Sequence, residues 1–385
     1  MKIAYFIPWL YNSGGMERVL SVKANYLAEK LGYEVWIVTS EQMGRPVYFP
    51  LSEKIKVVHY DFPLPENSGK FYSIFEYKIK YRENTKILKA KISDFLAENK
   101  IDICISTCEG REFSFLPQIK DGSAKIAEFH FTNFASQKNI HNSRNIFRKL
   151  YLKMMYATFI KTASRYQEFI VLTEEDSEEW GKHLNHVKSI YNPLTLRATE
   201  VSSLASFNVL SVGRLKHEKG FDLLINAWEI VNKSKPEWKL VICGDGPEKM
   251  ALSKQIEQKH LQHAVEIIPP TKEIENVYLN SSLYVLSSRN EGLGLVLMEA
   301  MLFGLPSVAF NCKCGPRELV DDGSTGFLTE NGNYLDLAEK IIKLLDDKDL
   351  RATFGRNARI KSQDYTLEKI MKQWDQLFLK LKLKI

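Results

Sequence analysis

The sequence predicts an α/β protein made of two doubly wound domains, each built on a parallel sheet. The first observation is alternation, because short β-branched, apolar runs are followed throughout by longer amphipathic segments, as in strand–helix–strand units. The second is length, since 385 residues exceed what one core of ordinary size serves. The third is composition: 44% hydrophobic and 26% charged residues exclude disordered, collagen-like and disulfide-scaffold proteins.

In the first half of the chain, each expected strand is a short apolar run. These strands are residues 3–9, 35–39, 56–59, 101–107, 125–129 and 169–173. The helical period is clearest in two of the segments between them, residues 17–31 and 85–99. Strands that are apolar along most of their length predict a parallel sheet covered by helices on both faces.

The alternation stops at residues 190–207, where Asn192-Pro193 precedes a Ser/Thr-rich run that we interpret as a linker. A second series follows, with strands at 208–213, 239–244, 265–268, 283–288 and 307–310. Its helices are expected at 221–233, 248–261, 272–280, 295–303 and 334–346. A last amphipathic helix, 366–382, is long enough to cross back to the first domain. The predicted domains are therefore 1–190 and 191–365, with a returning helix in 366–385.

The sequence shows no secretory signal and no clear membrane span. The opening run M-K-I-A-Y-F-I-P-W-L reads as a buried strand with one lysine and no cleavage site. The run that comes nearest to a membrane span, residues 292–310, contains Glu299 and Pro306 and is better explained as a helix followed by a strand.

The cysteines do not predict a disulfide framework or a zinc site. There are five of them, and the C-x-C formed by Cys312 and Cys314 has no matching second pair. A reducing, cytoplasmic location is therefore expected.

Three loops that follow strands carry the candidate chemistry, because ligands of doubly wound sheets lie at the carboxyl ends of the strands. The first loop is N-S-G-G-M-E-R, in which Gly14 and Gly15 let the backbone approach a ligand just before a helix begins. We include both glycines among the expected donor-binding residues. The alternative is a tight strand-to-helix turn with no ligand.

The second loop is V-G-R-L-K-H-E-K-G, residues 212–220. Arg214, as a forked guanidinium, and Lys219, as a point charge, are suited to holding a diphosphate between them. The alternative is a solvated basic turn, but the position after a strand favours binding.

The third loop and the helix after it read S-R-N-E-G-L-G-L-V-L-M-E-A, residues 288–300. The eight residues from Glu291 to Glu299 span on the order of 12 Å along a helix, which suits a sugar–diphosphate–ribose unit. The backbone of the helix start would meet phosphate, through Gly292, Leu293, Gly294 and Leu295. The alternative for Glu299 is a capped or paired glutamate, which an apolar helix makes less favourable.

Glu291 and Glu299, with seven residues between them, resemble the E-x7-E signature of retaining glycosyltransferases of family 4. The runs G-R-L-K-H-E-K-G and G-D-G-P-E resemble that family's diphosphate loop and a strand-to-helix turn. Gly14-Gly15, Asn192-Pro193 and the helix around Trp374 match as well, and C-K-C-G-P-R-E-L-V is similar to members that build bacterial surface glycans.

The resemblance implies the GT-B fold, with the acceptor on the first domain and the nucleotide-sugar on the second. It implies that Arg214 and Lys219 grip the donor diphosphate, that Glu291 contacts the donor sugar and that Glu299 contacts the ribose. His130, in A-E-F-H-F, matches a family histidine that reaches the transferred sugar; its alternative is a structural histidine. The sequence departs from many members at Pro269-Pro270, where they have a glycine near the nucleobase.

The segment 129–167 has no acidic residue and interleaves aromatic side chains with basic ones, namely Lys138, Arg144, Arg148, Lys149, Lys153, Lys161 and Arg165. A basic, aromatic amphipathic helix suits an anionic membrane surface. The alternatives are a core-packed helix with a basic outer face and a nucleic-acid patch, but no nucleic-acid motif accompanies it.

The expected function is transfer of a hexosyl unit from a UDP-sugar to a lipid-linked glycan acceptor in surface polysaccharide synthesis. Cytoplasmic location and peripheral contact with the inner face of the membrane are expected with it. The open alternatives are a nucleotide-sugar epimerase and a non-catalytic nucleotide-sugar binding protein. No cofactor and no metal ion are expected, because the clear D-x-D, Asp347-Lys348-Asp349, reads as a helix-end turn.

Overall fold

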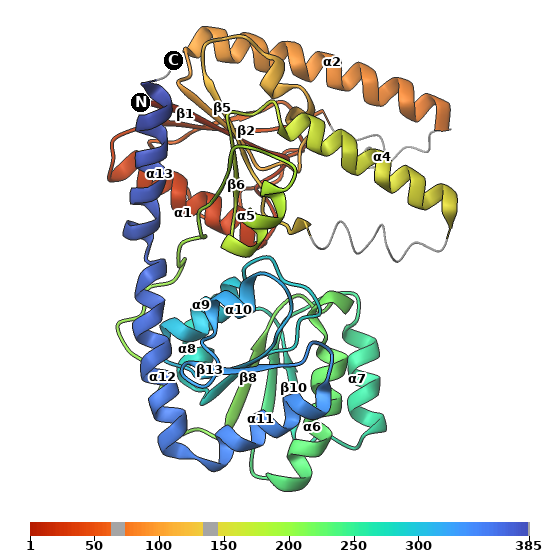
Figure 1. Cartoon of the computed structure of the whole chain (residues 1–385), viewed down its shortest axis with the longest axis vertical. Helices are drawn as coiled ribbons and strands as arrows, with labels where there is room; N and C mark the ends of the chain where they lie inside the picture. The colour runs from red at the N-terminus through yellow and green to blue at the C-terminus, as the bar shows by residue number, and fades with distance from the viewer. Residues whose placement is uncertain (63–73, 134–144, 384–385) are drawn as a thin grey trace. The chain divides into compact units, whose positions relative to one another are not determined.

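The computed structural model describes residues 1–62, 74–133 and 145–383, and the chain divides into two compact units. The first unit comprises Met1–Pro193 and Leu367–Ile385, and the second comprises Leu194–Thr366. Figure 1 shows that each unit contains its own central sheet flanked by helices.

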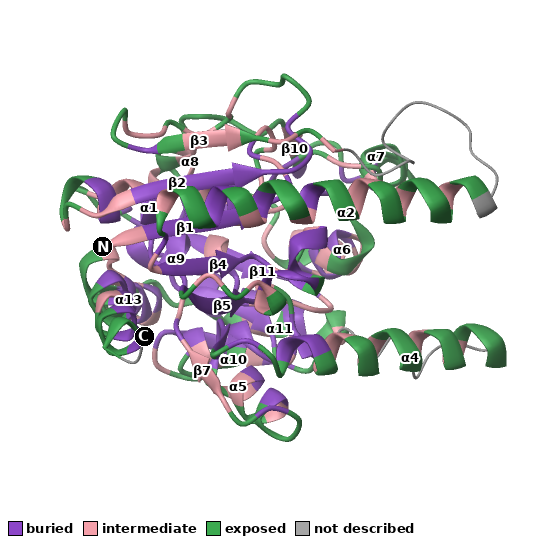
Figure 2. Ribbon diagram, turned by 90° about the horizontal axis from the view of Figure 1, so that it is seen from above, coloured by how far each residue is buried: buried purple, intermediate pink, exposed green. Residues whose placement is uncertain are grey.

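In the described part of the first unit, seven parallel strands form one sheet in the order β3-β2-β1-β4-β5-β6-β7. The strands are β1 Lys2–Ile7, β2 Glu34–Thr39, β3 Lys56–His59, β4 Ile103–Ser106, β5 Ala124–Glu128, β6 Glu168–Val171 and β7 Val187–Ser189. The α-helices are α1 Gly15–Glu29, α2 Ile74–Asn99, α4 Ile146–Ala163, α5 Glu174–Gly181 and α13 Leu367–Lys382. The central strands are almost wholly buried, as the purple ribbons of Figure 2 show, because helices cover both faces.

The second unit repeats this plan with six parallel strands in the order β10-β9-β8-β11-β12-β13. The strands are β8 Asn208–Val212, β9 Lys239–Cys243, β10 Val265–Ile268, β11 Leu283–Leu286, β12 Ser307–Phe310 and β13 Gly326–Thr329. The α-helices are α6 Phe221–Ser234, α7 Lys249–Gln258, α8 Ile274–Leu279, α9 Leu295–Leu302, α10 Gly315–Leu319, α11 Tyr334–Asp346 and α12 Lys348–Ser362.

The strand order places a topological switch point in each sheet. In the first unit the winding reverses between β1 and β4, and in the second between β8 and β11. At such a point the loops after the two neighbouring strands run in opposite directions and leave a crevice at the carboxyl edge. The loops that follow β1, β4, β8 and β11 are therefore the places where these units can bind ligands.

The structure adds two short strands to those that the sequence predicts. β7 and β13 are edge strands of their sheets, with sequences V-K-S and G-F-L-T. These strands are too short to show an alternation of apolar and polar residues in the sequence. Only their pairing with β6 and β12 identifies them as strands.

α12 was also not predicted, but the interpretation of the D-x-D as a helix-end turn is confirmed. Asp347 ends α11, and its carboxylate caps α12 by accepting a hydrogen bond from the backbone N–H of Leu350 at 2.8 Å.

The returning helix α13 completes the core of the first unit. Its apolar face is buried against residues of α1 and of the sheet, through Ile370, Met371, Trp374, Leu377, Phe378 and Leu381. At its edge, the hydroxyl of Tyr33 donates a hydrogen bond to Asp375 at 2.5 Å. The C-terminal segment therefore packs in the same core as Ile3 and Tyr5 of β1, at the other end of the chain.

A buried ion pair links α1 to β5 beneath this helix. The Lys23 ammonium lies 2.6 Å from Glu128, and the two side chains are 1% and 3% exposed. The ammonium also lies 3.7 Å from the centroid of the Trp374 ring, a cation–π contact. Burial alone raises the pKa of Glu128, but Lys23 and His130 more than offset this and lower the pKa to about 2.

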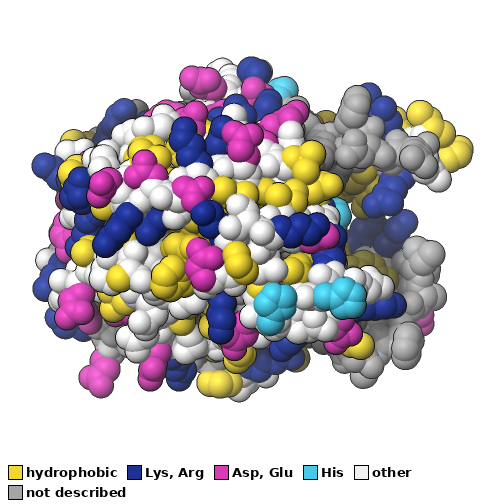
Figure 3. All heavy atoms as spheres, turned by 90° about the horizontal axis from the view of Figure 1, so that it is seen from below, with side chains coloured by type: hydrophobic (Ala, Val, Ile, Leu, Met, Phe, Trp, Pro, Cys, Tyr) yellow, Lys and Arg dark blue, Asp and Glu magenta, His cyan; other side chains and the backbone are white. Residues whose placement is uncertain are grey.

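The net charge of +6 is small for a chain of 385 residues. On the face in Figure 3, Lys and Arg side chains are interspersed with Asp and Glu side chains. In the residues that the structure describes, none of the helices is long and apolar enough to cross a membrane.

We predict that Glu128→Gln lowers the free energy of unfolding by about 3–5 kcal/mol, because it leaves the Lys23 charge buried without a counter-charge. The double variant Lys23→Met/Glu128→Gln should recover most of this loss. In the native chain, the stability from Glu128 is present above pH 4.5 and is lost as the pH falls towards 2.

Chemical denaturation across pH measures both effects. The matched control is Glu34→Gln, which breaks the exposed pair with Lys56 and should change stability by at most about 1 kcal/mol. Equal losses at Glu34 and Glu128 would contradict the prediction.

Candidate functional site

Lys219 and Glu291, two residues expected at the donor site, contact each other. Lys219 lies in the loop after β8, in the short 3-10 helix His217–Lys219, and Glu291 lies in the loop after β11. The Lys219 ammonium donates to both carboxylate oxygens of Glu291, at 2.9 and 2.7 Å. The side chains are 25% and 11% exposed, so this charge pair is partly shielded from solvent. The pair lies at the switch point of the second sheet, where a ligand is expected.

An arginine that the sequence analysis missed holds these two loops together. Arg289 donates to both carboxylate oxygens of Asp222 at 2.7 and 2.6 Å, and to the backbone carbonyl of His217 at 2.7 Å. Its own backbone N–H donates to the carbonyl of Glu218 at 2.8 Å. Partial burial raises the pKa of Asp222, but the bonds from Arg289 outweigh it and lower that pKa. The only sequence signal was the position of Arg289 at a strand end.

Gly220 allows the two loops to approach closely. Its φ is +65°, and a Cβ added there would lie 2.0 Å from the carbonyl oxygen of Ser287. The Ser287 hydroxyl in turn donates to the carbonyl of Lys219 at 3.0 Å. Any side chain at Gly220 would separate Lys219 from the end of β11, so this glycine positions the charge pair.

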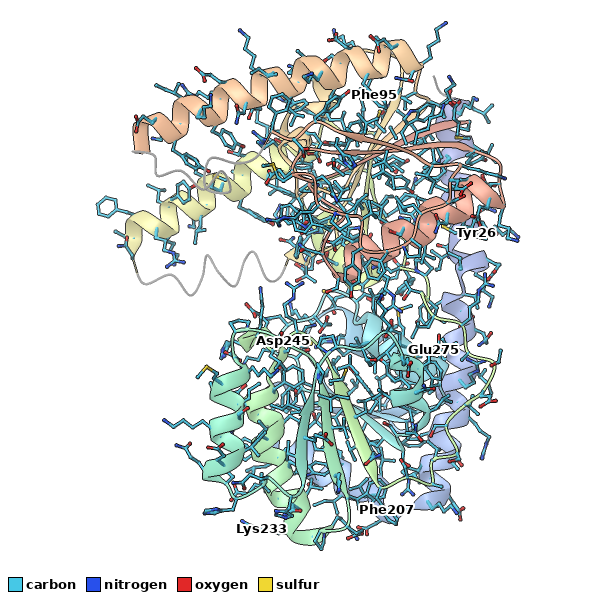
Figure 4. The ribbon with its side chains drawn as sticks, turned by 180° about the vertical axis from the view of Figure 1, so that it is seen from behind. Tyr26, Phe95, Phe207, Lys233, Asp245 and Glu275 are labelled. Atoms are coloured by element: carbon cyan, nitrogen blue, oxygen red, sulfur yellow. The ribbon has the colours of Figure 1, made fainter. Side chains whose placement is uncertain are left out.

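Arg214 lies in the same basic loop, and its side chain is exposed. Within the described residues, its guanidinium forms no ion pair and no hydrogen bond, which leaves all of its donors for a ligand. The loop itself is fixed, because the N–H of Leu215 donates to the carbonyl of Asp245 at 2.8 Å. Asp245, labelled in Figure 4, follows β9 at the carboxyl edge of the sheet.

The start of α9 provides unpaired backbone donors beside this loop. Gly294 precedes the helix with a φ of +88°, and in the described part of the chain the N–H groups of Leu295 and Val296 have no acceptor. Gly315 packs tightly here: its N–H donates to the carbonyl of Gly292 at 3.2 Å, and a Cβ on it would lie 2.1 Å from the carbonyl of Leu293. Helix-start donors of this kind favour an anion.

Glu299 lies inside the second unit rather than in a loop. It is 3% exposed, and its carboxylate accepts a hydrogen bond from the Tyr278 hydroxyl at 2.9 Å and from Thr195 at 3.3 Å. These bonds agree with the alternative of a paired helix glutamate and also fix the carboxylate on α9. Contact with a ribose stays a prediction.

The glycines of the first loop face a carboxylate of the chain itself. Gly14 and Gly15 begin α1, and the carboxylate of Glu17, 5% exposed, lies where a Cβ on Gly14 would be, at 2.2 Å. Trp9 fixes this carboxylate by donating its indole N–H at 3.1 Å. The positive end of α1 is thus partly compensated by Glu17. A donor contact at Gly14 and Gly15 stays a prediction.

His130 follows β5 in the first unit, nine-tenths buried. Its Nε2 lies 3.2 Å from the Glu128 oxygen that also binds Lys23. This arrangement fixes the ring through one nitrogen, as the structural alternative expects, and leaves Nδ1 as the other polar atom of the ring. Its role at the transferred sugar stays a prediction.

α4 is largely exposed, and Figures 1 and 2 show it extending away from the sheet of the first unit, in the same direction as α2. Apolar side chains repeat along one stripe of its first turns, at Ile146, Phe147, Leu150, Tyr151, Met154 and Met155, each 49–80% exposed. The alternative of a core-packed helix is therefore wrong for this part, whereas the later Tyr156, Phe159, Ile160 and Ala163 pack in the core. Lys138 and Arg144 lie outside the described residues.

Within residues 1–62, 74–133 and 145–383, no three Asp, Glu, His or Cys side chains group in a way that would hold a metal ion. At the second switch point, positive groups are present on Arg214, on Lys219 and at the start of α9.

Three comparisons with known proteins bear on this geometry. The sequence profile described as Glycosyl transferases group 1 matches residues 196–361, which include the switch point of the second sheet. An uncharacterized glycosyltransferase of Haemophilus influenzae is 30% identical, over 97% of this chain and 98% of its own length. The amylovoran biosynthesis glycosyltransferase AmsD of Erwinia amylovora is 29% identical, over 98% and 99%.

The same arrangement of elements occurs in a solved structure of a TarM variant of Staphylococcus aureus, in complex with Fondaparinux, alpha-GlcNAc-glycerol and UDP. Its TM-score is 0.77 at 20% identity, over 98% of this chain and 100% of that one. At that identity the likeness concerns the fold, and it confirms the two Rossmann-like units of the GT-B fold.

We predict that Lys219→Ala lowers kcat roughly a hundredfold to a thousandfold, because one fixed positive charge is lost where negative charge develops. Steady-state kinetics at saturating donor measure this effect. Lys216→Ala, in the same loop and exposed, is the matched control and should leave kcat unchanged. A purely KM effect at Lys219 would contradict a role in bond breaking.

The two glutamates should differ kinetically. Glu291→Gln is expected to lower kcat sharply with the fold intact, because the residue lies in a loop at the expected sugar position. Glu299→Ala is expected mainly to weaken donor binding, about tenfold to a hundredfold for a lost bond to a charged group. Thermal unfolding checks that both variants fold, and a large fall in kcat for Glu299→Ala at saturating donor would argue against the ribose assignment.

Proposed function

This chain belongs to the Glycosyl transferases group 1 family, and from that membership we propose that it transfers a hexosyl unit from a UDP-sugar to a lipid-linked glycan acceptor. Surface polysaccharide synthesis is the proposed setting, supported by the name of the amylovoran relative. The UDP bound in the TarM structure supports the proposed nucleotide. The observation that carries the proposal is the bidentate contact of Lys219 with Glu291 at a switch point inside the family match.

In this proposal the donor diphosphate takes the place of Glu291 as the partner of Lys219. Breaking the anomeric C–O bond leaves negative charge on the departing diphosphate, and fixed positive groups aimed at it lower the barrier. Lys219, the exposed Arg214 and the free N–H groups of Leu295 and Val296 supply them. Glu291, released from Lys219, then accepts from hydroxyls of the donor sugar.

The loops need little rearrangement for this exchange. Arg289 holds them through Asp222 and two backbone contacts, so Lys219 stays in position while its partner changes. Groups held in place before the reaction stabilise a transition state without a reorganisation cost. We further propose retention of anomeric configuration, with same-face attack and the leaving phosphate helping to take the acceptor proton. No carboxylate nucleophile is assigned.

We also propose that α4 places the first unit on an anionic membrane surface, where a lipid-linked acceptor would be reached from the cytoplasmic side. Its exposed apolar stripe and the exposed Arg148 and Lys153 support this proposal. An interfacial helix buries such a stripe among lipid headgroups while its basic residues meet anionic lipids.

The donor and the absence of a metal requirement can be tested together. UDP should raise the Tm of the chain, and UDP release from a UDP-sugar should require an acceptor. Release of UDP or isomerisation of the sugar without an acceptor would favour an epimerase. Binding of UDP without turnover would favour a binding protein.

Transfer should survive a chelator, because protein groups meet the diphosphate charge. The metal-free mechanism would be contradicted if a chelator abolished transfer and manganese or magnesium restored it.

The membrane proposal predicts weaker binding to anionic vesicles when Arg148, Lys149 and Lys153 are replaced by Gln, by about 1 kcal/mol per charge at most. Vesicle sedimentation measures this. The control replaces three exposed lysines of the second unit, Lys216, Lys254 and Lys272, which changes the net charge equally. Equal losses in both triple variants would point to general charge attraction and would remove α4 from the proposal.

A further inference from the structure

Arg111 carries a buried guanidinium that has no hydrogen-bond partner in the described part of the chain. It is the first residue of the 3-10 helix Arg111–Ser114, directly after β4, and it is 6% exposed. Within residues 1–62, 74–133 and 145–383, none of its three guanidinium nitrogens, Nε, Nη1 and Nη2, has a hydrogen-bond partner. A guanidinium carries five N–H donors, and a buried charge with unmet donors destabilises a fold. A buried polar group without a partner therefore calls for an explanation other than stability.

The carboxylates near Arg111 do not satisfy it. Glu41, at the end of β2, and Glu112 both act on its charge, but neither bonds to it. Glu112 instead accepts a hydrogen bond from the hydroxyl of Ser106 at 2.9 Å. Burial raises the pKa of Glu112 to about 7, so near neutral pH this carboxyl is only partly charged. The described surroundings therefore leave positive charge and all of the donors of Arg111 uncompensated.

Arg111 follows a strand at a switch point, where the ligand-binding groups of doubly wound sheets lie. It follows β4, which pairs with β1 at the switch point of the first unit. The corresponding strand of the second unit is β11, and the loop after β11 carries Glu291. Six strands of the first sheet have the same order as the six of the second, so Arg111 follows the strand that corresponds to β11.

We infer that Arg111 binds an oxyanion of the acceptor, a phosphate or a carboxylate, at the switch point of the first unit. The inference rests on the proposed function, in which this unit takes the acceptor. The forked guanidinium matches two oxygens of such a group and would make two parallel charge-assisted bonds. The partly exposed Tyr81 of α2 lies over the guanidinium, with its ring centroid 6.0 Å from Cζ, so a ligand of Arg111 would also contact this ring.

The test measures the Tm of the chain with UDP at saturation, so that the basic loop of the second unit is occupied, while inorganic phosphate or acetate is added. Phosphate should raise the Tm of the native chain and leave that of Arg111→Met unchanged. Arg111→Lys keeps the charge without the fork and should respond more weakly. Arg82→Met, an exposed arginine of α2, is the matched control and should respond as the native chain does.

Two further readouts make the test decisive. Without added anion, the Tm of Arg111→Met should equal or exceed that of the native chain, because an unpaired buried charge is removed. Its response to UDP should be unchanged. A response to phosphate alone supports a phosphate on the acceptor, and a response to acetate as well supports a carboxylate.

Three results would overturn the inference: a phosphate response that survives Arg111→Met, a lower Tm for that variant without ligand, or a weaker response of that variant to UDP. The second would show a structural ion pair, and the third would assign Arg111 to the donor. A native chain that responds to phosphate but not to UDP would instead count against the proposed function.

Discussion

The carboxyl ends of parallel strands lie at one edge of their sheet, and this constraint governs where the candidate site residues of this chain lie. In a doubly wound sheet the helices after neighbouring strands pack on opposite faces where the winding reverses, so their loops separate at that edge. The second unit places Lys219 after β8 and Glu291 after β11 at such a point. The first unit places Gly14 after β1 and Arg111 after β4 at the equivalent point. Residues that are far apart in the sequence meet at that point, because strand pairing determines which loops lie side by side.

The charges at the second switch point are arranged in advance of any ligand. Lys219 has Glu291, and Arg289 has Asp222 together with two backbone groups. These two pairs differ in function. The Arg289 pair joins the loops and is bonded on several sides, whereas the Lys219 pair joins two side chains that a donor would separate. Under the proposed function, this arrangement keeps the cation shielded and oriented, and the ligand would replace Glu291 as its partner.

The first unit depends on polar groups that are buried for structural reasons as well as for chemistry. Lys23 and Glu128 satisfy each other beneath Trp374, so the helix that closes the core, α13, also covers a charge. His130 is attached to that same carboxylate. Arg111 is the contrasting case, because its surroundings leave it unsatisfied. α4 shows the same contrast among apolar residues, since its last turns pack on the core while its first turns remain exposed.

The sequence by itself determined the fold class, the principal strands and the family, because apolar period and glycine-rich motifs are local properties of the chain. It identified Lys219 and Glu291 for the same reason: each lies in a motif at a strand end. It did not identify Arg289, Tyr278 or Arg111 as functional or supporting residues: Arg289 lies within the 288–300 motif without a role assigned to it, and Tyr278 and Arg111 lie in segments without a motif. It also left open whether α4 packs on the core. The tertiary structure decided those matters, because the sheet determines which distant segments meet. It brings Lys219 to Glu291 and Tyr278 to Glu299. It also leaves Arg111 without a hydrogen-bond partner in the described residues.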